Sequence, residues 1–214
     1  MQVSSIMTRY CRSTAVFGFL AALCLGGSCG QAPPRRGMEL AQIREFEAQK
    51  RDREVFVIDT DFGQIVILPL KEAAKTHVRE LGNMIKRGFY DGLAFHFVEP
   101  GKMIQGGDVN SRDDDPTNDG AGDPGFNIQP EINAPNFVGS VGLAHPPGKP
   151  EKGNSQFYIL LRDMPELNGR YTVFGTVVDG MSVVKKISEV PTDAEGRPLK
   201  KVIIKRVYIE ERFV

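Results

Sequence analysis

The segment "FHFVEPGKMIQGGD", residues 95–108, contains the side chains that point most clearly to a functional site. His96 and Gln105 stand among two Phe and a Met, beside a pair of glycines, and apolar residues occupy positions where a soluble loop would be polar. The segment contains no Ser and no Cys, so it offers no covalent nucleophile of the usual kind. A site built from it would therefore act through binding and hydrogen bonding.

The remaining histidines and serines do not suggest another reaction. The chain has three histidines, His77, His96 and His145, and they lack the spacing of a zinc site. We expect His77 to be a packed or half-exposed residue of a helix. Ser140 and Ser155 lack the Gly-x-Ser-x-Gly context of a serine hydrolase. We expect no metal and no cofactor.

Two other segments, an acidic loop and a glycine pair, have a simpler interpretation than a ligand site. The acidic loop at 110–125 fails the EF-hand register, because Asn118 would stand at the Gly position and Pro124 at the Glu position, so we interpret it as a solvated loop. The glycine pair at 106–107 is followed by no Gly-Lys-Ser/Thr sequence. It indicates a bulge or a close backbone approach instead of a phosphate loop.

Short strand patterns dominate the chain after Glu54. Runs rich in β-branched and aromatic residues predict strands at 55–60, 64–70, 93–99, 102–108, 137–145, 154–161, 171–178 and 200–211. Apolar residues at helical spacing predict helices at 71–88 and 180–190. Because the strands do not alternate with helices, the pattern favours an antiparallel barrel or sandwich.

Three segments resemble, in the same order, the successive signatures of the cyclophilins, a family of peptidyl-prolyl cis-trans isomerases. They are "FHFVEPGKMIQGGD", "GNSQFYILL" and "LNGRYTVFGTVVDG". The resemblance extends from about Val55 to Ile209. It implies a mainly β fold, a closed eight-stranded antiparallel β-barrel capped by two α-helices. It also implies rotation about the peptide bond before proline, a reaction that needs no nucleophile.

The resemblance implies a role for each position that matches the family's motifs. The expected catalytic residues are Gln105, Lys102 and His96, and Gln105 would hydrogen-bond the substrate backbone. The expected substrate-binding residues are Phe97, Met103, Ala144, His145, Gln156, Phe157, Tyr158, Leu167 and Tyr171. Within that set, Met103, Phe157 and Leu167 would wall the pocket for the proline ring.

Two of the departures from the family's pattern are the most serious. Phe97 stands where the family has its principal catalytic Arg, and Lys102 stands where it has a Phe of the proline pocket. One hypothesis is that the pair has exchanged roles, so that Phe97 fills the apolar wall and Lys102 supplies the charge. The alternative is that Lys102 extends into water and the site is degraded. We expect reduced isomerase activity, with a non-catalytic proline-binding or chaperone-like module as the alternative.

The first thirty residues differ from the rest of the chain. A basic start, an apolar run of about fifteen residues and small residues predict a secretory signal over 1–30. All three cysteines lie there, and Cys29 stands where a bacterial lipoprotein carries its lipid. Simple cleavage near Gly30 is the alternative. We expect an exported protein, either periplasmic or anchored on the outside of the cytoplasmic membrane by a lipid on Cys29.

Composition limits the partners. Lys and Arg number 27, as do Asp and Glu, so the formal charge is zero and a nucleic-acid partner is not expected. A spacer with a short charged helix is predicted at 31–53, and a cyclophilin-like domain at 54–214. The expected partners are Xaa-Pro segments of unfolded or extended polypeptides, and we expect a monomer.

Overall fold

The computed structural model describes residues 52–146 and 148–214. The expected signal segment, Cys29 and nearly all of the predicted spacer lie outside these residues. Among the residues described, no helix has the length and apolar character that a membrane span requires.

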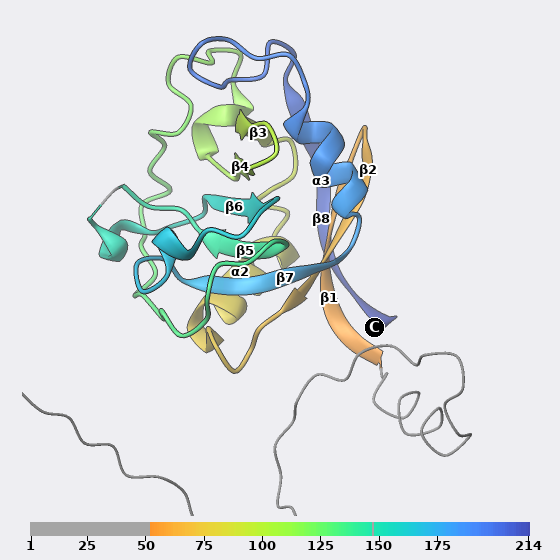
Figure 1. Cartoon of the computed structure of the whole chain (residues 1–214), viewed down its shortest axis with the longest axis vertical. Coiled ribbons are helices and arrows are strands. Elements are labelled where there is room, and N and C mark those ends of the chain that lie inside the picture. The colour runs from red at the N-terminus through yellow and green to blue at the C-terminus, as the bar shows by residue number, and fades with distance from the viewer. Residues whose placement is uncertain (1–51, 147) are drawn as a thin grey trace, which may run out of the picture. The chain divides into compact units, whose positions relative to one another are not determined.

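Eight antiparallel strands close into a barrel (Figure 1). In chain order they are β1 (Asp52–Thr60), β2 (Gly63–Pro69), β3 (Ala94–Glu99), β4 (Met103–Gly106), β5 (Ser140–Leu143), β6 (Phe157–Leu160), β7 (Val173–Asp179) and β8 (Val202–Phe213). Around the barrel the order is β1-β2-β7-β5-β6-β4-β3-β8, and β1 closes it by pairing with β8. This confirms the fold predicted from the sequence.

Two helices, α2 (Lys75–Lys86) and α3 (Met181–Ser188), pack against the barrel (Figure 1). Leu81 and Ile85 of α2 and Val184 and Ile187 of α3 belong to the same core cluster as the inward-facing residues of the strands. The helices predicted at 71–88 and 180–190 are confirmed. Short 3₁₀ turns, which the sequence did not predict, follow β4, β5 and β6: η1 (Val109–Arg112), η2 (Pro150–Lys152) and η3 (Pro165–Leu167).

Alternation along the strands separates the barrel interior from a smaller apolar cluster on its outer face. In β4, Ile104 belongs to the main core cluster, whereas its neighbour Met103 packs on the smaller cluster. In β6, Ile159 belongs to the main core, whereas Tyr158 and Leu160 belong to the smaller cluster. Because successive strand residues point to opposite faces, the short strands β4 and β6 contribute to both.

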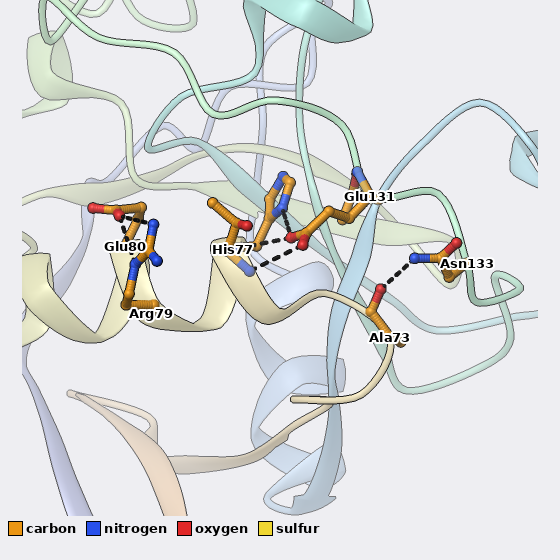
Figure 2. Close-up of polar contacts among 8 residues, drawn as sticks. Ala73, His77, Arg79, Glu80, Glu131 and Asn133 are labelled. Atoms are coloured by element: carbon orange, nitrogen blue, oxygen red, sulfur yellow. Dashed lines mark hydrogen bonds and ion pairs between the residues drawn. The ribbon is translucent and has the colours of Figure 1, made fainter.

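A glutamate from a distant part of the chain caps the N-terminus of helix α2. The residue before the helix, Ala74, has no side chain that can cap it. The Glu131 carboxylate accepts hydrogen bonds from the backbone N–H groups of Thr76 and His77, each at 3.0 Å (Figure 2). It also contacts Nδ1 of the fully buried His77 at 2.7 Å. Glu131 therefore caps α2, and His77 is a packed residue, as one of the two expected readings had it.

The Glu131–His77 contact makes stability depend on pH. Partial burial acts to raise the pKa of Glu131, but the hydrogen bonds from His77 and Thr76 outweigh it and lower that pKa to about 2. Burial lowers the pKa of His77, and Glu131 offsets only part of this effect. The unfolded chain therefore binds protons more readily at both groups. Stability should fall as the pH drops below 6.5 and then below 4.5, the ordinary values for His and Glu.

Replacing Glu131 should weaken the fold measurably. We expect Glu131→Ala to lower the free energy of unfolding at pH 7 by about 2 kcal/mol, because the helix loses its cap and a charge-assisted hydrogen bond. The difference from wild type should shrink as the pH falls from about 5 to about 2, where Glu131 itself becomes protonated. Urea unfolding at several pH values measures both effects. Glu151→Ala, at an exposed position, is the matched control, and equal losses in the two variants would contradict the capping role.

Candidate active site

An open groove of about 720 Å³ crosses the outer face of the barrel beside β4 and β6. Most of the predicted site residues line it: Lys102, Met103, Gln105, Ala144, His145, Gln156, Tyr158, Leu167 and Tyr171. His96, Phe97 and Phe157 do not. The groove therefore brings together residues that lie up to about seventy positions apart in the chain.

The groove also has a side that the sequence reasoning missed. It is formed by the loop at 120–123 and by Asn127, Lys149, Lys152 and Asn154. Asn154 stands inside the motif "GNSQFYILL", so the motif itself was a signal for that residue. The other residues lie in loops or, for Lys152, in the short turn η2, where no periodic pattern marks them.

One end of the groove is an apolar cup. We use this name for Met103, Tyr158, Met164, Leu167 and Tyr171, which pack together as one cluster with Ala144 and Leu160. Tyr158 is its floor, because it is only 2% exposed yet borders the groove. The walls come from β4, from η3 and from the residues just before β7. A cup of this kind can hold a small apolar ring.

The prediction that Phe157 walls the proline pocket is wrong. Phe157 is 4% exposed and lies in the main core, where its ring contacts Tyr90 and Phe95 edge-on, with centroids 5.9 Å apart in both pairs. Neighbouring residues of a strand face opposite sides. Since Phe157 faces the barrel interior, its neighbour Tyr158 faces the cup instead.

Gln105 is held in a network of amides. Its Nε2 donates to Oε1 of Gln156 at 3.0 Å and lies 3.5 Å from Nε2 of His96. Nε2 of Gln156 donates in turn to the carbonyl oxygen of Gly120 at 3.2 Å. Within the described part of the chain, both amide hydrogens of Gln105 thus point toward protein partners. Its Oε1 remains able to accept a hydrogen bond from a substrate N–H.

His96 lies beneath this network and does not line the groove. It is 5% exposed, and burial lowers its pKa while the charge of Asp108 acts in the opposite direction. A neutral ring can accept through Nε2 the hydrogen that Gln105 directs toward it. The expectation of a catalytic His96 is therefore corrected: the residue orients Gln105 and does not touch the groove.

Phe97 lies beside Gln105 but outside the groove. The strand register places Phe97 directly opposite Gln105, so both side chains occupy the same face. The Phe97 ring packs against Gly196, where a Cβ atom would lie 2.8 Å from Cε2 of the ring. The expectation that Phe97 binds substrate is therefore corrected, because the half-buried ring packs on the turn around Gly196 and does not line the groove.

Lys102 does lie at the groove, but its charge is engaged. Its Nζ contacts both carboxylate oxygens of Glu99, at 2.9 and 2.8 Å. The side chain is 29% exposed, so it neither extends fully into water nor lies free inside the cup. A cation is present at the groove edge, and Glu99 competes with a substrate for it.

His145 and Tyr171 together form a stacked part of the groove wall. Their rings stack with centroids 4.1 Å apart and an interplanar angle of 15°. Nδ1 of His145 lies 2.9 Å from the carbonyl oxygen of Pro146, and Nε2 lies 3.1 Å from that of Arg170. These contacts hold the imidazole in place as a wall.

The glycine pair marks a close backbone approach, as predicted. Gly107 has φ +85°, and a Cβ atom there would lie 2.6 Å from the carbonyl oxygen of Ser155. Ser155 Oγ donates to the carbonyl oxygen of Gly107 at 2.8 Å. This contact joins the residues that follow β4 to those that precede β6, and so fixes the spacing of Gln105 and Gln156.

The acidic loop forms its own turns. Asp113, Asp115 and Asp123 each accept the backbone N–H of the residue two positions later, at 2.8 or 2.9 Å. In residues 52–146 and 148–214, no three His, Cys, Asp or Glu side chains come together in a way that could hold a metal ion.

Comparison with known proteins shows which sequences this chain resembles. Residues 55–209 match the family model described as cyclophilin type peptidyl-prolyl cis-trans isomerase/CLD. The chain is similar to peptidyl-prolyl cis-trans isomerase-like 1 of Rhizopus delemar, at 37% identity over 150 residues, which cover 68% of this chain and 87% of that protein. It is also similar to a probable peptidyl-prolyl cis-trans isomerase of Brucella abortus, at 39% identity over 144 residues, covering 64% and 72%.

The structure resembles a solved one as well. A crystal structure of a cyclophilin type peptidyl-prolyl cis-trans isomerase from Cryptosporidium parvum, in the presence of the dipeptide Ala-Pro, has a TM-score of 0.64 and 28% sequence identity to this chain. The match covers 73% of this chain and 98% of that one.

Proposed function

Because the chain belongs to the cyclophilin-type peptidyl-prolyl cis-trans isomerase family, we propose that it isomerises Xaa-Pro bonds in exported polypeptides, at a rate reduced by the loss of the usual Arg. One observation carries the proposal: an apolar cup with Tyr158 as its floor lies next to an oriented amide, that of Gln105, in a single groove. The motifs that predicted this activity from sequence lie within the matched range.

The groove contains two features that would support the reaction, an apolar cup and an oriented amide. Rotation about an amide bond has a barrier of about 20 kcal/mol, because resonance between the nitrogen and the carbonyl is lost. The cup would hold the proline ring while Oε1 of Gln105 accepts a hydrogen bond from the neighbouring backbone. Rotation then proceeds in a bound and partly desolvated substrate, and contacts that are strongest in the twisted state lower the barrier.

The substrate class is inferred by analogy. The Cryptosporidium parvum protein was crystallised with the dipeptide Ala-Pro, which supports Xaa-Pro segments as the ligands of this groove. The groove is open, so a segment of an extended or unfolded chain could enter it from the side. We propose that the protein acts on such segments as a monomer.

We propose a reduced rate because, among the residues that the structure describes, the groove lacks a free cation at the position where the reaction would use one. Twisting the bond places a lone pair on the proline nitrogen, and a cation near it would stabilise the transition state. Phe97 supplies no charge, and Nζ of Lys102 is held by Glu99. The same two facts favour the second candidate function, a non-catalytic module that binds proline segments and has lost turnover.

Exchange spectroscopy on a short Ala-Pro peptide distinguishes the two functions. The uncatalysed interconversion takes roughly tens of seconds or longer. Enhanced cis-trans exchange at catalytic protein concentration would support the isomerase. Chemical-shift changes on groove residues such as Gln105 and Tyr171, without faster exchange, would support the binding module and refute the enzyme.

Export and anchoring can be tested at Cys29. If a lipid on this cysteine anchors the chain, Cys29→Ser should move the protein from the membrane fraction to the soluble exported fraction. Cell fractionation measures the change, and Cys24→Ser in the same segment is the control, expected to leave the distribution as it is. A membrane fraction that persists in Cys29→Ser would exclude this anchor. A wild-type protein that is already soluble and exported would support simple cleavage near Gly30.

A further inference from the structure

The floor of the cup carries a hydroxyl that bonds inside the protein. Tyr158 is 2% exposed, and its Oη donates to Oδ1 of Asn136 at 2.5 Å. Burial raises the pKa of Tyr158, so the hydroxyl keeps its proton. A phenylalanine would fill the same apolar space without this bond, and the proposed reaction makes no use of the hydroxyl.

The strand beside Tyr158 leaves room for this arrangement. Gly142 of β5 lies opposite Tyr158 in the register of the sheet. A Cβ atom on Gly142 would lie 2.2 Å from both Cζ and Oη of the tyrosine. The absence of a side chain at 142 therefore allows the phenol to lie across β5 and to reach Asn136.

Asn136 connects the floor of the cup to one of its walls. It is fully buried, and its backbone N–H donates to Oδ1 of Asn168 at 2.7 Å. Its carbonyl oxygen accepts from the N–H of Met164 at 3.1 Å, and the N–H of Leu167 donates to the carbonyl oxygen of Met164 at 3.0 Å. Asn136 thus bonds to both ends of the turn that carries Met164 and Leu167, and to the floor.

We propose that the hydrogen-bond chain Tyr158–Asn136–Asn168 fixes the width of the cup, so that the site selects the five-membered ring of proline over larger cyclic imino acids. Tyr158 and Leu167 both border the groove, and the chain of bonds holds the segments that carry them at a set distance. Asn136 and Asn168 are positioning residues, since their bonds reach the cup only through other residues. The inference rests on the proposed function, because it assumes that a proline ring occupies the cup.

A pocket wall held by hydrogen bonds distinguishes ring sizes more sharply than a wall held by apolar packing alone. One extra methylene in a tight apolar pocket typically changes recognition by roughly 10- to 200-fold. The same methylene costs little where a wall can move aside. Removing the Tyr158 hydroxyl should therefore relax the choice between ring sizes, whereas a merely structural bond would lower stability without changing that choice.

The test compares two peptides that are identical except for one residue, proline or its six-membered homologue pipecolic acid. Dissociation constants are measured by NMR titration, and cis-trans exchange is measured on the same samples. The wild type should bind the proline peptide about 10-fold more tightly or better. Tyr158→Phe and Asn168→Ala should reduce that ratio to about threefold or less. Asn168→Asp keeps the accepting Oδ1 and should keep the wild-type ratio.

Tyr90→Phe is the matched control. Tyr90 is also buried, and its hydroxyl donates to the carbonyl oxygen of Ser155 at 3.1 Å, outside the cup. This variant should lose stability and retain the ring preference. An unchanged ratio in Tyr158→Phe and Asn168→Ala, or a wild type without preference, would overturn the inference. A wild type that prefers proline but does not accelerate exchange would refute the proposed turnover and support the inference.

Discussion

Exchanging the two unusual residues, as Phe97→Arg together with Lys102→Phe, should raise kcat/KM for a short Xaa-Pro peptide by about 100-fold. An Arg at 97 would stand directly opposite Gln105, on the same face of the barrel. Its planar guanidinium would present a fixed charge near the proline nitrogen, which the flexible ammonium of Lys102 does less well. A Phe at 102 would add an aromatic wall to the cup and would end the contact with Glu99.

The single variants separate the exchange hypothesis from simple degradation. Phe97→Arg alone should help little, because Lys102 would remain at the groove edge in place of an aromatic wall. If Lys102 is the substitute cation, Lys102→Ala should abolish the exchange activity. Activity that stays the same in Lys102→Ala would show that Lys102 has no such role. NMR exchange rates measure all of these variants, and thermal unfolding checks that each one folds.

Gln105→Ala should lower kcat/KM by about 100-fold, a loss typical of removing one preorganised hydrogen-bonding group. Its side chain is the amide in the groove that His96 and Gln156 orient together. The contact with substrate backbone would be lost, and Oε1 of Gln156 would lose the hydrogen bond that it accepts from Gln105. Exchange spectroscopy gives the rate, and peptide titration shows how much of the loss arises in binding.

Gln64→Ala is the control for this substitution. Gln64 lies on β2, where its amide contacts Tyr208 and Arg212, and it does not line the groove. Its removal should leave exchange within about twofold of wild type, as expected of a surface change far from the site. A Gln105→Ala variant that retains more than about a third of the activity would contradict the assigned role.

Local sequence patterns were sufficient to predict the strands and an antiparallel barrel or sandwich, and the resemblance to the family predicted the closed barrel. Each strand is a short run with its own alternation, and the turn at Asp61-Phe62-Gly63 joins the first two, so these elements depend on neighbouring residues alone. The motifs also predicted part of the groove, because Met103, Gln105 and Gln156 stand within them. The predicted roles were wrong for residues whose assignment depended on which face of a strand the side chain occupies.

The tertiary structure decided those faces through register and long-range contacts. The pairing of β3 with β4 shifts between Phe95 and Phe97, which leaves His96 as the extra residue of a bulge. Strict alternation would direct Phe97 into the interior with Phe95, but the shift places it beside Gln105.

Long-range pairing also explains the contacts that no motif predicted. Glu131 caps α2 through the N–H of Thr76, 55 residues earlier in the chain, and Tyr158 reaches Asn136 only because Gly142 lies opposite it. A run of sequence determines which element it forms, because that choice depends on near neighbours. Which side chains meet in the groove depends on how distant strands and loops are paired, and that pairing exists only in the closed barrel.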